Sequence, residues 1–101
     1  MDLGLRNKVA LVAAASKGLG KASAMSLAQE GARLVICSRN EQSIRKTAEE
    51  IRAKTGATVV PVVADVSKNE EITTFVQTAI RETLQAHENL LRGEPYVGAR
   101  L

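Results

Sequence analysis

Three short apolar runs that alternate with three longer amphipathic stretches constrain the fold of this chain more than any other feature. The runs cover residues 9–14, 33–37 and 58–63, and apart from Arg33 and Thr58 at their first positions they are continuously apolar rather than alternating in polarity. A continuous run of this length is typical of a strand that is buried on both faces. The stretches that follow the runs repeat their apolar residues at helical spacing. The sequence therefore predicts the order strand, helix, strand, helix, strand, helix.

Local start and stop signals place the first two helices. The first is expected over residues 18–30, with Gly31 in the position after its C-cap, where a left-handed residue is favoured. Ser38 and Glu41 have the spacing of a capping box, which predicts that a second helix begins there. Gly56 is expected to end it.

The third helix carries the longest apolar stripe of the chain. Ser67 and Glu70 again have capping-box spacing and are expected to start it. The stripe consists of Ile72, Phe75, Val76, Ala79, Ile80, Leu84, Leu90 and Leu91. Gly93 and Pro95 are expected to end the helix.

Alternating strands and helices predict an α/β fold with a parallel sheet, because right-handed crossovers must place helices over the apolar strand faces. The expected strand order is 3-2-1, with the first two helices on one face of the sheet and the third on the other. Pro61 indicates that the third strand lies at an edge. No apolar run of four or more residues follows Ile80, so a fourth strand is missing. We therefore expect a unit over residues 1–80, followed by a helix continuation and tail over residues 81–101.

The composition excludes several classes of site. The 101 residues contain one cysteine, Cys37, and one histidine, His87, so neither an internal disulfide nor a metal site is expected. Cys37 is expected to be a small buried hydrophobe, and His87 a partly buried or cap-adjacent residue. Two aromatic residues, Phe75 and Tyr96, are too few for a nucleic-acid stacking platform. The longest apolar run has seven residues, too few to span a membrane, and a cytoplasmic protein is expected.

Positive charge is concentrated in the first half of the chain, because positions 1–56 contain ten Lys and Arg residues but only five Asp and Glu residues. In this half, the first apolar run leads into the segment Ala13-Ala-Ala-Ser-Lys-Gly-Leu-Gly20. A glycine-rich turn between a strand and a helix allows backbone N–H groups and the positive helix end to approach a phosphate. Glycines at such a turn also occur for steric reasons alone. The position of this turn within a strand–helix–strand unit favours phosphate binding.

These residues resemble the opening of the short-chain dehydrogenase/reductase family, whose signature is a strand, a Thr-Gly-x-x-x-Gly-x-Gly turn and a helix. The resemblance covers about residues 1–80 and includes Gly31-Ala32, Ser38-Arg39-Asn40 and Ala64-Asp65-Val66-Ser67. It implies the N-terminal half of a Rossmann-like fold and is strongest to the 3-oxoacyl-ACP-reductase-like branch. Ala13 replaces the family's threonine and Ala14 its first glycine. Ala14 is tolerable with a negative φ, whereas a positive φ costs stability and would misplace the loop.

The resemblance implies a dinucleotide site, and the charges in it favour NADP over NAD. Ser38 and Arg39 lie where NAD-preferring members carry a carboxylate, and Lys17 precedes Gly18 as a second cation. We expect NADPH to bind about tenfold or more tightly than NADH, although two basic residues can also fall in a surface loop by chance. The expected cofactor-binding residues are Ala14, Ser16, Lys17, Gly18, Leu19, Gly20, Ser38, Arg39, Asp65 and Val66.

Two of these residues have roles that only the resemblance implies. Asp65 corresponds to the family acid that accepts a hydrogen bond from the adenine amino group, with the N–H of Val66 beside it. The alternative is a solvated acid that stabilises the start of the next helix.

The catalytic residues of the family are not expected in this chain. Tyr96 and Arg100 have the family's Tyr-x-x-x-Lys spacing, but with Arg in place of Lys and in a Pro- and Gly-containing stretch, so chance is the better explanation. The chain is therefore interpreted as the NADP(H)-binding part of an oxidoreductase acting on carbonyl or secondary alcohol groups. The alternative is a non-catalytic nucleotide-binding or assembly module that forms a homo-oligomer through its open sheet edge and last helix.

Overall fold

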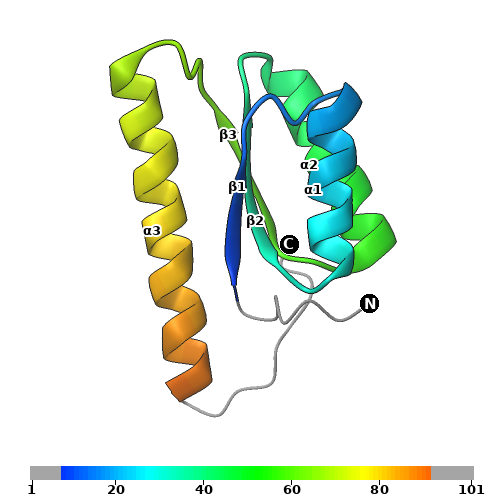
Figure 1. Ribbon diagram of the computed structural model, residues 1–101, viewed down its shortest axis with the longest axis vertical. Helices are drawn as coiled ribbons and strands as arrows, with labels where there is room; N and C mark the ends of the chain where they lie inside the picture. Colours follow the sequence, from blue (N-terminus) through cyan, green and yellow to red (C-terminus); the bar gives the residue numbers. More distant parts are fainter. Residues whose placement is uncertain (1–7, 92–101) are drawn as a thin grey trace.

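The structure is a computed structural model that describes residues 8–91 as three layers (Figure 1). Strands and helices alternate strictly along the chain. The elements are β1 (Val9–Val12), α1 (Gly18–Gln29), β2 (Arg33–Ser38), α2 (Glu41–Thr55), β3 (Val59–Val63) and α3 (Asn69–Leu91). The predicted order of elements is confirmed.

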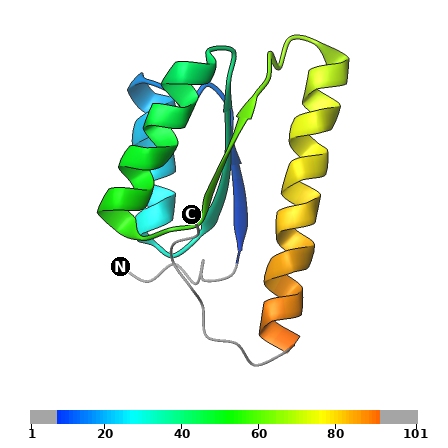
Figure 2. The same ribbon diagram turned by 180° about the vertical axis from the view of Figure 1, so that it is seen from behind.

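The three strands form one parallel sheet in the order β1-β2-β3, as the sequence predicted. Val9 pairs with Arg33, and Leu34 pairs with Val59, so all three strands begin at nearly the same level. Helices α1 and α2 cover one face of the sheet and α3 covers the other, which is visible from both sides (Figures 1 and 2). Pro61 lies in the edge strand β3, also as expected.

Two separate cores lie on the two faces of the sheet, because side chains of the central strand alternate between them. Leu34 and Ile36 pack against α1 and α2 in the larger core, together with Ile44 and Ile51 of α2. On the other face, Val35 and Cys37 of β2 and Ala64, which follows β3, pack against Phe75 and Ala79 of α3. The smaller core leaves part of the apolar surface of α3 uncovered.

Both predicted helix-ending glycines adopt the left-handed conformation. At Gly31 the φ angle is 94°, its N–H donates to Ala28 O at 3.0 Å, and Ala32 N–H donates to Leu27 O at 3.1 Å. This pair of bonds is a Schellman motif, which satisfies carbonyls at the end of α1. Gly56 has a φ of 73° and ends α2 in the same left-handed conformation.

The two predicted capping boxes do not form. Asn40, rather than Ser38, caps α2, since its side chain accepts from Ser43 N–H at 2.9 Å. The Ser38 hydroxyl lies two residues before this N-cap and accepts from Asn40 N–H at 3.2 Å. At the start of α3, the Ser67 hydroxyl donates to Asp65 Oδ1 at 2.7 Å. Serine hydroxyls bond to whichever local partner is nearer, and here that partner lies in the preceding turn.

Three further expectations need correction. Strand β1 ends at Val12, and residues 13–16 form a turn instead of completing the run. The strand is also only partly buried, with Leu11 45% exposed, because β1 lies at the edge of the described sheet. Of the two expectations for His87, partly buried or cap-adjacent, the first is wrong, because the residue is exposed. The predicted end of α3 at Gly93 and Pro95 lies outside the described residues.

An ion pair fastens the C-terminal half of α3 to the sheet. Arg33 begins β2 with a side chain that is only 3% exposed, and it donates to Glu82 Oε1 at 3.0 Å. The Glu82 side chain is 23% exposed. Since a buried guanidinium without a countercharge is costly, the pair should stabilise the docked helix.

We expect the substitution Glu82→Ala to lower the free energy of unfolding by about 1–3 kcal/mol, because it leaves Arg33 buried without a countercharge. Chemical denaturation followed by circular dichroism measures this change. The matched control is Arg45→Ala, which breaks an exposed pair with Glu41 and should change stability by less than about 0.5 kcal/mol. Equal effects of the two substitutions would contradict a structural role for the buried pair.

Candidate functional site

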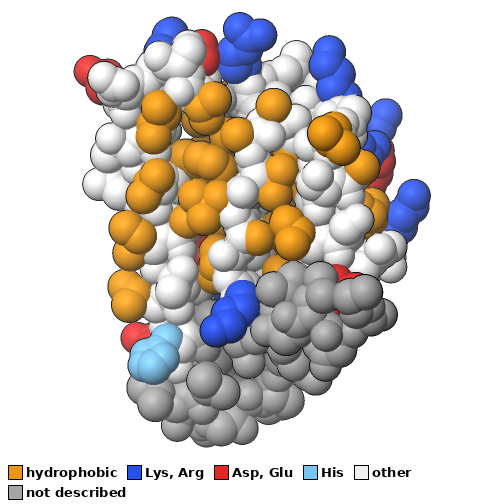
Figure 3. All heavy atoms as spheres, in the orientation of Figure 1, with side chains coloured by type: hydrophobic (Ala, Val, Ile, Leu, Met, Phe, Trp, Pro, Cys, Tyr) orange, Lys and Arg blue, Asp and Glu red, His pale blue; other side chains and the backbone are white. Residues whose placement is uncertain are grey.

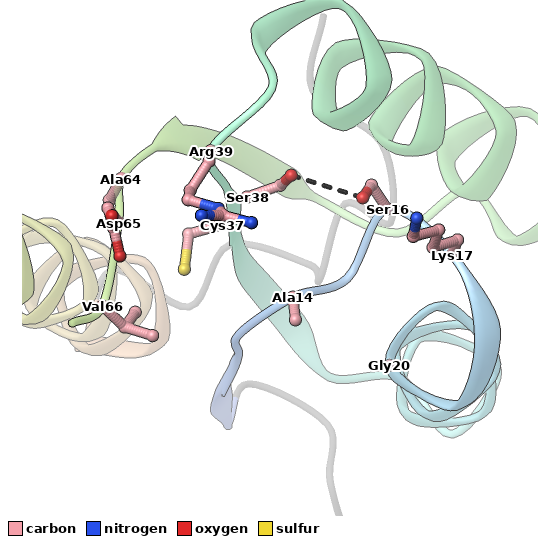
Figure 4. A pocket seen from close by; sticks show the side chains of 10 residues that line it. All are labelled: Ala14, Ser16, Lys17, Gly20, Cys37, Ser38, Arg39, Ala64, Asp65 and Val66. Atoms are coloured by element: carbon pink, nitrogen blue, oxygen red, sulfur yellow. Dashed lines mark hydrogen bonds between the residues drawn. The ribbon is translucent and has the colours of Figure 1, made fainter.

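A cavity of about 440 Å³ lies where the chain leaves the three strands at their carboxyl ends (Figure 4). Ala14 follows β1, Ser38 and Arg39 stand at the end of β2, and Asp65 and Val66 follow β3. Figure 4 shows Asp65 and Val66 on one side of this space and Lys17 on the other. Crevices at the carboxyl ends of parallel strands are the usual binding sites of such sheets.

The turn between β1 and α1 has an unusual backbone. Ala14 has a φ of 52°, and among residues 8–91 it is the one non-glycine residue with a positive φ. The sequence predicted that a positive φ at Ala14 would be unfavourable. Such a backbone conformation costs about 1–2 kcal/mol of strain. Gly18 adopts a φ of 61° without such a cost. At Gly20, a Cβ atom would overlap the carbonyl oxygen of Ala14, so glycine is required there by close packing of the turn.

Three hydrogen bonds hold this turn in place despite the strain. Ala15 N–H donates to Cys37 O at 3.1 Å, and the Ser38 hydroxyl donates to the Ser16 hydroxyl at 3.3 Å (Figure 4). Thr47 of α2 donates from Oγ1 to Ser16 O, also at 3.3 Å. The turn is therefore fixed by β2 and α2, and the misplacement expected for a positive φ at Ala14 is opposed by these contacts.

Thr47 is a positioning residue that sequence reasoning missed. It lies on the inner face of α2, between Ile44 and Ala48, and only 2% of its surface is exposed. A buried polar residue on an otherwise apolar helix face normally has a hydrogen-bond partner. That signal was present in the sequence, but the identity of the partner, Ser16, depends on how α2 packs against the turn.

The N-terminus of α1 faces the cavity without a side-chain cap. Its N-cap residue, Lys17, makes no capping hydrogen bond, and the first turn contains no acidic residue. By contrast, Asn40 caps α2, and α3 has Glu70 and Glu71 in its first turn. The unsatisfied N–H groups and the positive end of the α1 dipole are therefore free to bind an anion.

A second hollow of about 520 Å³ adjoins the first and is lined entirely by polar or charged residues. These residues are Ser16, Lys17, Ser38, Arg39, Asn40 and Ser43. Two cations and no carboxylate line it, so its electrostatic character favours an anionic group.

Asp65 is held in a hydrogen-bonded turn on the opposite side of the cavity. Its Oδ1 accepts from the hydroxyl and from the N–H of Ser67, at 2.7 and 2.9 Å. These bonds to Ser67, followed by the charges of Arg39 and Lys68, hold the pKa of Asp65 below its ordinary value. Asp65 is therefore ionised at neutral pH and can accept a hydrogen bond. This contribution to stability is present at neutral pH and is lost as the pH falls through the lowered pKa.

Eight of the ten predicted site residues line the first cavity. They are Ala14, Ser16, Lys17, Gly20, Ser38, Arg39, Asp65 and Val66. Gly18 and Leu19 belong to the same turn but do not line it, and Leu19 is 83% exposed. Cys37 and Ala64 also line the cavity and were not predicted, since Cys37 ends one apolar run and Ala64 directly follows another, and neither carries a polar signal. The segment Tyr96–Arg100 lies outside the described residues.

Cys37 is buried, as the sequence predicted, with 1% of its surface exposed. Burial raises the pKa of its thiol above the ordinary value, and a hydrogen bond from the Ala14 backbone opposes this shift only partly. The thiol is therefore protonated at neutral pH, which makes it a poor nucleophile.

The comparison with protein families gives one clear match. A family model described as short chain dehydrogenase matches residues 8–87. The oxidoreductase YvrD of Bacillus subtilis is 36% identical over 77 residues, which are 76% of this chain and 28% of that protein. This chain therefore spans less than one third of the length of that relative.

Solved structures agree with the sequence match. The L-sorbose reductase of Gluconobacter frateurii, in complex with NADPH and L-sorbose, superposes with a TM-score of 0.75 at 33% identity, covering 77% of this chain and 30% of that one. A short chain dehydrogenase/reductase of Burkholderia phymatum in complex with NAD gives 0.74 at 30% identity, covering 78% and 28%. Within residues 8–91, we find no helix that meets the length and hydropathy needed to cross a membrane, and no metal-binding group of three or more His, Cys, Asp or Glu residues.

The strained turn yields a stability prediction. We expect Ala14→Gly to raise the free energy of unfolding by about 0.5–1 kcal/mol, because removal of the left-handed strain outweighs the added flexibility of the unfolded chain. Chemical denaturation measures the change.

The neighbouring residue provides the control for this prediction. Ala13 has no positive φ, so Ala13→Gly should lower the free energy of unfolding by about 0.5–1 kcal/mol through chain entropy alone. If both substitutions destabilise the protein to the same extent, the turn is not strained at Ala14.

Proposed function

The chain belongs to the short-chain dehydrogenase family, and on this premise we propose that it is the NADP(H)-binding N-terminal portion of an oxidoreductase acting on carbonyl or secondary alcohol groups. The observation that carries the choice of cofactor is the polar hollow beside the main cavity, with Lys17 and Arg39 among its lining residues. A 2′-phosphate carries the negative charge that this hollow favours, and NAD lacks this group.

Separate parts of the site would hold separate parts of the dinucleotide. The uncapped N-terminus of α1, reached through Gly18 and Gly20, would bind the pyrophosphate. Arg39 and Lys17 would bind the 2′-phosphate, and Ser38 the ribose beside it. Asp65 and the N–H of Val66 would bind the adenine. The remaining proposed contacts come from Ala14, Ser16 and Leu19 in the same turn.

The shape of the site fits this assignment. Gly20 allows the turn to pack closely, because no Cβ stands between α1 and the Ala14 carbonyl. Ser16 and Ser38 are bonded to each other between the two cavities, so the turn is positioned before any ligand arrives. A bound nicotinamide cofactor supplies hydride transfer. The proposed role of this chain is to hold and orient it.

We assign no acid–base group to this chain and propose that residues 1–80 form the cofactor-binding unit, with residues 81–101 as a continuation. On this proposal the chain alone is inactive as a reductase. The substrate would be a carbonyl compound, with an oxoacyl thioester as one candidate from the similarity of the opening segment. A cytoplasmic location is proposed because the single cysteine is unpaired.

A second candidate function is a homo-oligomeric assembly module. It is favoured by the large aliphatic side chains that stay exposed on β1 and α3 (Figure 3). Leu11, Ile80 and Leu84 are 45%, 53% and 58% exposed. A contiguous apolar surface of this kind is more often an interface than a free surface.

Isothermal titration calorimetry with NADPH and NADH tests the proposed cofactor. We expect NADPH to bind at least about tenfold more tightly, because only NADPH carries the group that Lys17 and Arg39 would bind. Substitution of Arg39 by Gln should reduce this difference to less than about threefold and leave the affinity for NADH nearly unchanged.

The matched control is Arg81→Gln, which removes the same charge from α3, outside both cavities. This variant should keep the preference of the wild type. Equal affinities for the two cofactors in the wild type would refute the NADP assignment. Turnover of a carbonyl substrate clearly above the buffer rate would refute the proposal that the chain lacks catalytic machinery.

A further inference from the structure

We propose that Thr47 is a positioning residue that determines cofactor specificity. Its buried hydroxyl holds the two walls of the polar hollow together against the repulsion between Lys17 and Arg39, so that the hollow selects a ligand with a 2′-phosphate. The inference rests on the proposed function and concerns a residue that lines neither cavity. It is carried by the direction of the Thr47 hydrogen bond, by the placement of the two cations, and by contacts that hold α1 to α2 without Thr47.

The hydrogen bond of Thr47 is exceptional among the helical threonines of residues 8–91. The other five each donate to the carbonyl oxygen four residues earlier in their own helix; they are Thr55, Thr73, Thr74, Thr78 and Thr83. This local bond is the common one for a threonine inside a helix. Thr47 instead donates to Ser16 O at 3.3 Å, across 31 residues of the chain. Its hydroxyl therefore serves the turn before α1 and not its own helix.

The polar hollow has two walls that come from different parts of the chain. The turn before α1 supplies Ser16 and Lys17, whereas the end of β2 and the start of α2 supply the other four lining residues, Arg39 among them. Each wall therefore contributes one cation. Since like charges repel, Lys17 and Arg39 work to separate the walls until an anion binds between them.

Ser16 is the residue through which the two walls are joined. Its carbonyl oxygen accepts from Thr47, and its hydroxyl accepts from the Ser38 hydroxyl at 3.3 Å (Figure 4). Ser16 and Ser38 are both half-buried, so water competes for the bond between their hydroxyls, whereas Thr47 is buried and its hydroxyl is shielded from water. Ser38 is also proposed to bind the ribose. Thr47 is then the contact that still holds Ser16 when a ligand is bound.

Helices α1 and α2 are attached to each other without Thr47. Lys21 Nζ of α1 and Glu50 Oε2 of α2 form an ion pair at 2.5 Å. Ile44 and Ile51 of α2 belong to the core between these helices and the sheet. Neither contact involves a residue that lines the hollow. Loss of the Thr47 hydroxyl should therefore loosen the turn while the helix pair and the sheet stay folded.

Only a cofactor with a 2′-phosphate needs both walls of the hollow. On the proposed function, the pyrophosphate binds at the N-terminus of α1 and the adenine at Asp65, and both groups are common to NADH and NADPH. The 2′-phosphate would lie between Lys17 and Arg39. It gains from both cations only while the walls are close, because the attraction between charges falls with distance. Thr47 should therefore act on the preference for NADPH and leave dinucleotide binding itself in place.

Isothermal titration calorimetry of Thr47→Val tests this role, because valine has nearly the shape of threonine and lacks the donor. We expect the affinity for NADPH to fall about fivefold to tenfold, the effect of one lost hydrogen bond, and the affinity for NADH to change less than about twofold. Retained binding of NADH also shows that the variant is folded. Thr47→Ser keeps the hydroxyl and should retain the preference of the wild type.

The matched control is Thr78→Val. Thr78 is also buried, at 8% exposed, but its hydroxyl donates to Thr74 O within α3, outside both cavities. This variant loses the same chemical group and should leave both affinities unchanged.

A double-mutant cycle separates the proposed role from general support of the turn. If Thr47 acts by holding the two cations together, its hydroxyl should matter little once one cation is gone. In the Lys17→Gln background, Thr47→Val should therefore lower the affinity for NADPH by less than about twofold, whereas independent effects would multiply. The same fold-loss in both backgrounds would overturn the proposal, because Thr47 would then support the turn without regard to Lys17.

The outcomes distinguish this inference from the proposed function. Equal affinities of the wild type for NADPH and NADH refute the choice of cofactor, and the role of Thr47 falls with it. A wild type that prefers NADPH, together with a Thr47→Val variant that keeps this preference, overturns the role of Thr47 alone. Loss of the preference in Thr47→Val, with its retention in Thr47→Ser and Thr78→Val, supports the inference.

Discussion

The two-sided burial of β2 is the constraint on which the rest of the structure depends. Leu34 and Ile36 fill the core under α1 and α2, while Val35 and Cys37 fill the core under α3. Both edges of β2 are hydrogen-bonded to neighbouring strands. Its last carbonyls, those of Cys37 and Ser38, then accept from Ala15 and Ala64, so the same strand also orders the segments that line the cavity.

The turn that lines the cavity shows how such a support makes local strain tolerable. The left-handed Ala14 and the close approach of Gly20 belong to one tight turn, and contacts to Cys37 and Thr47 hold it. Strained backbone persists only where its surroundings determine its conformation. The turn leaves the start of α1 without a side-chain cap, and the anion binding proposed there depends on this geometry.

The two edges of the sheet differ in the backbone groups that they present outward. At β3, Pro61 has no N–H to donate and the Val59 carbonyl accepts from the Arg52 guanidinium, whereas within residues 8–91 the only strand paired with β1 is β2. The apolar stripe of α3 runs beside the open edge. Two relatives are more than three times as long as the region that this chain matches.

The sequence by itself determined the order of elements, the parallel sheet, the opposite placement of α3 and most of the residues that line the cavity, because apolar periodicity and glycine positions are local signals. Tertiary structure decided what depends on distant partners. It showed Asn40, not Ser38, as the cap of α2, gave Ala14 its positive φ, and brought Thr47 to Ser16 across 31 residues. It also exposed Leu11, since the burial of an apolar strand depends on what lies beside it.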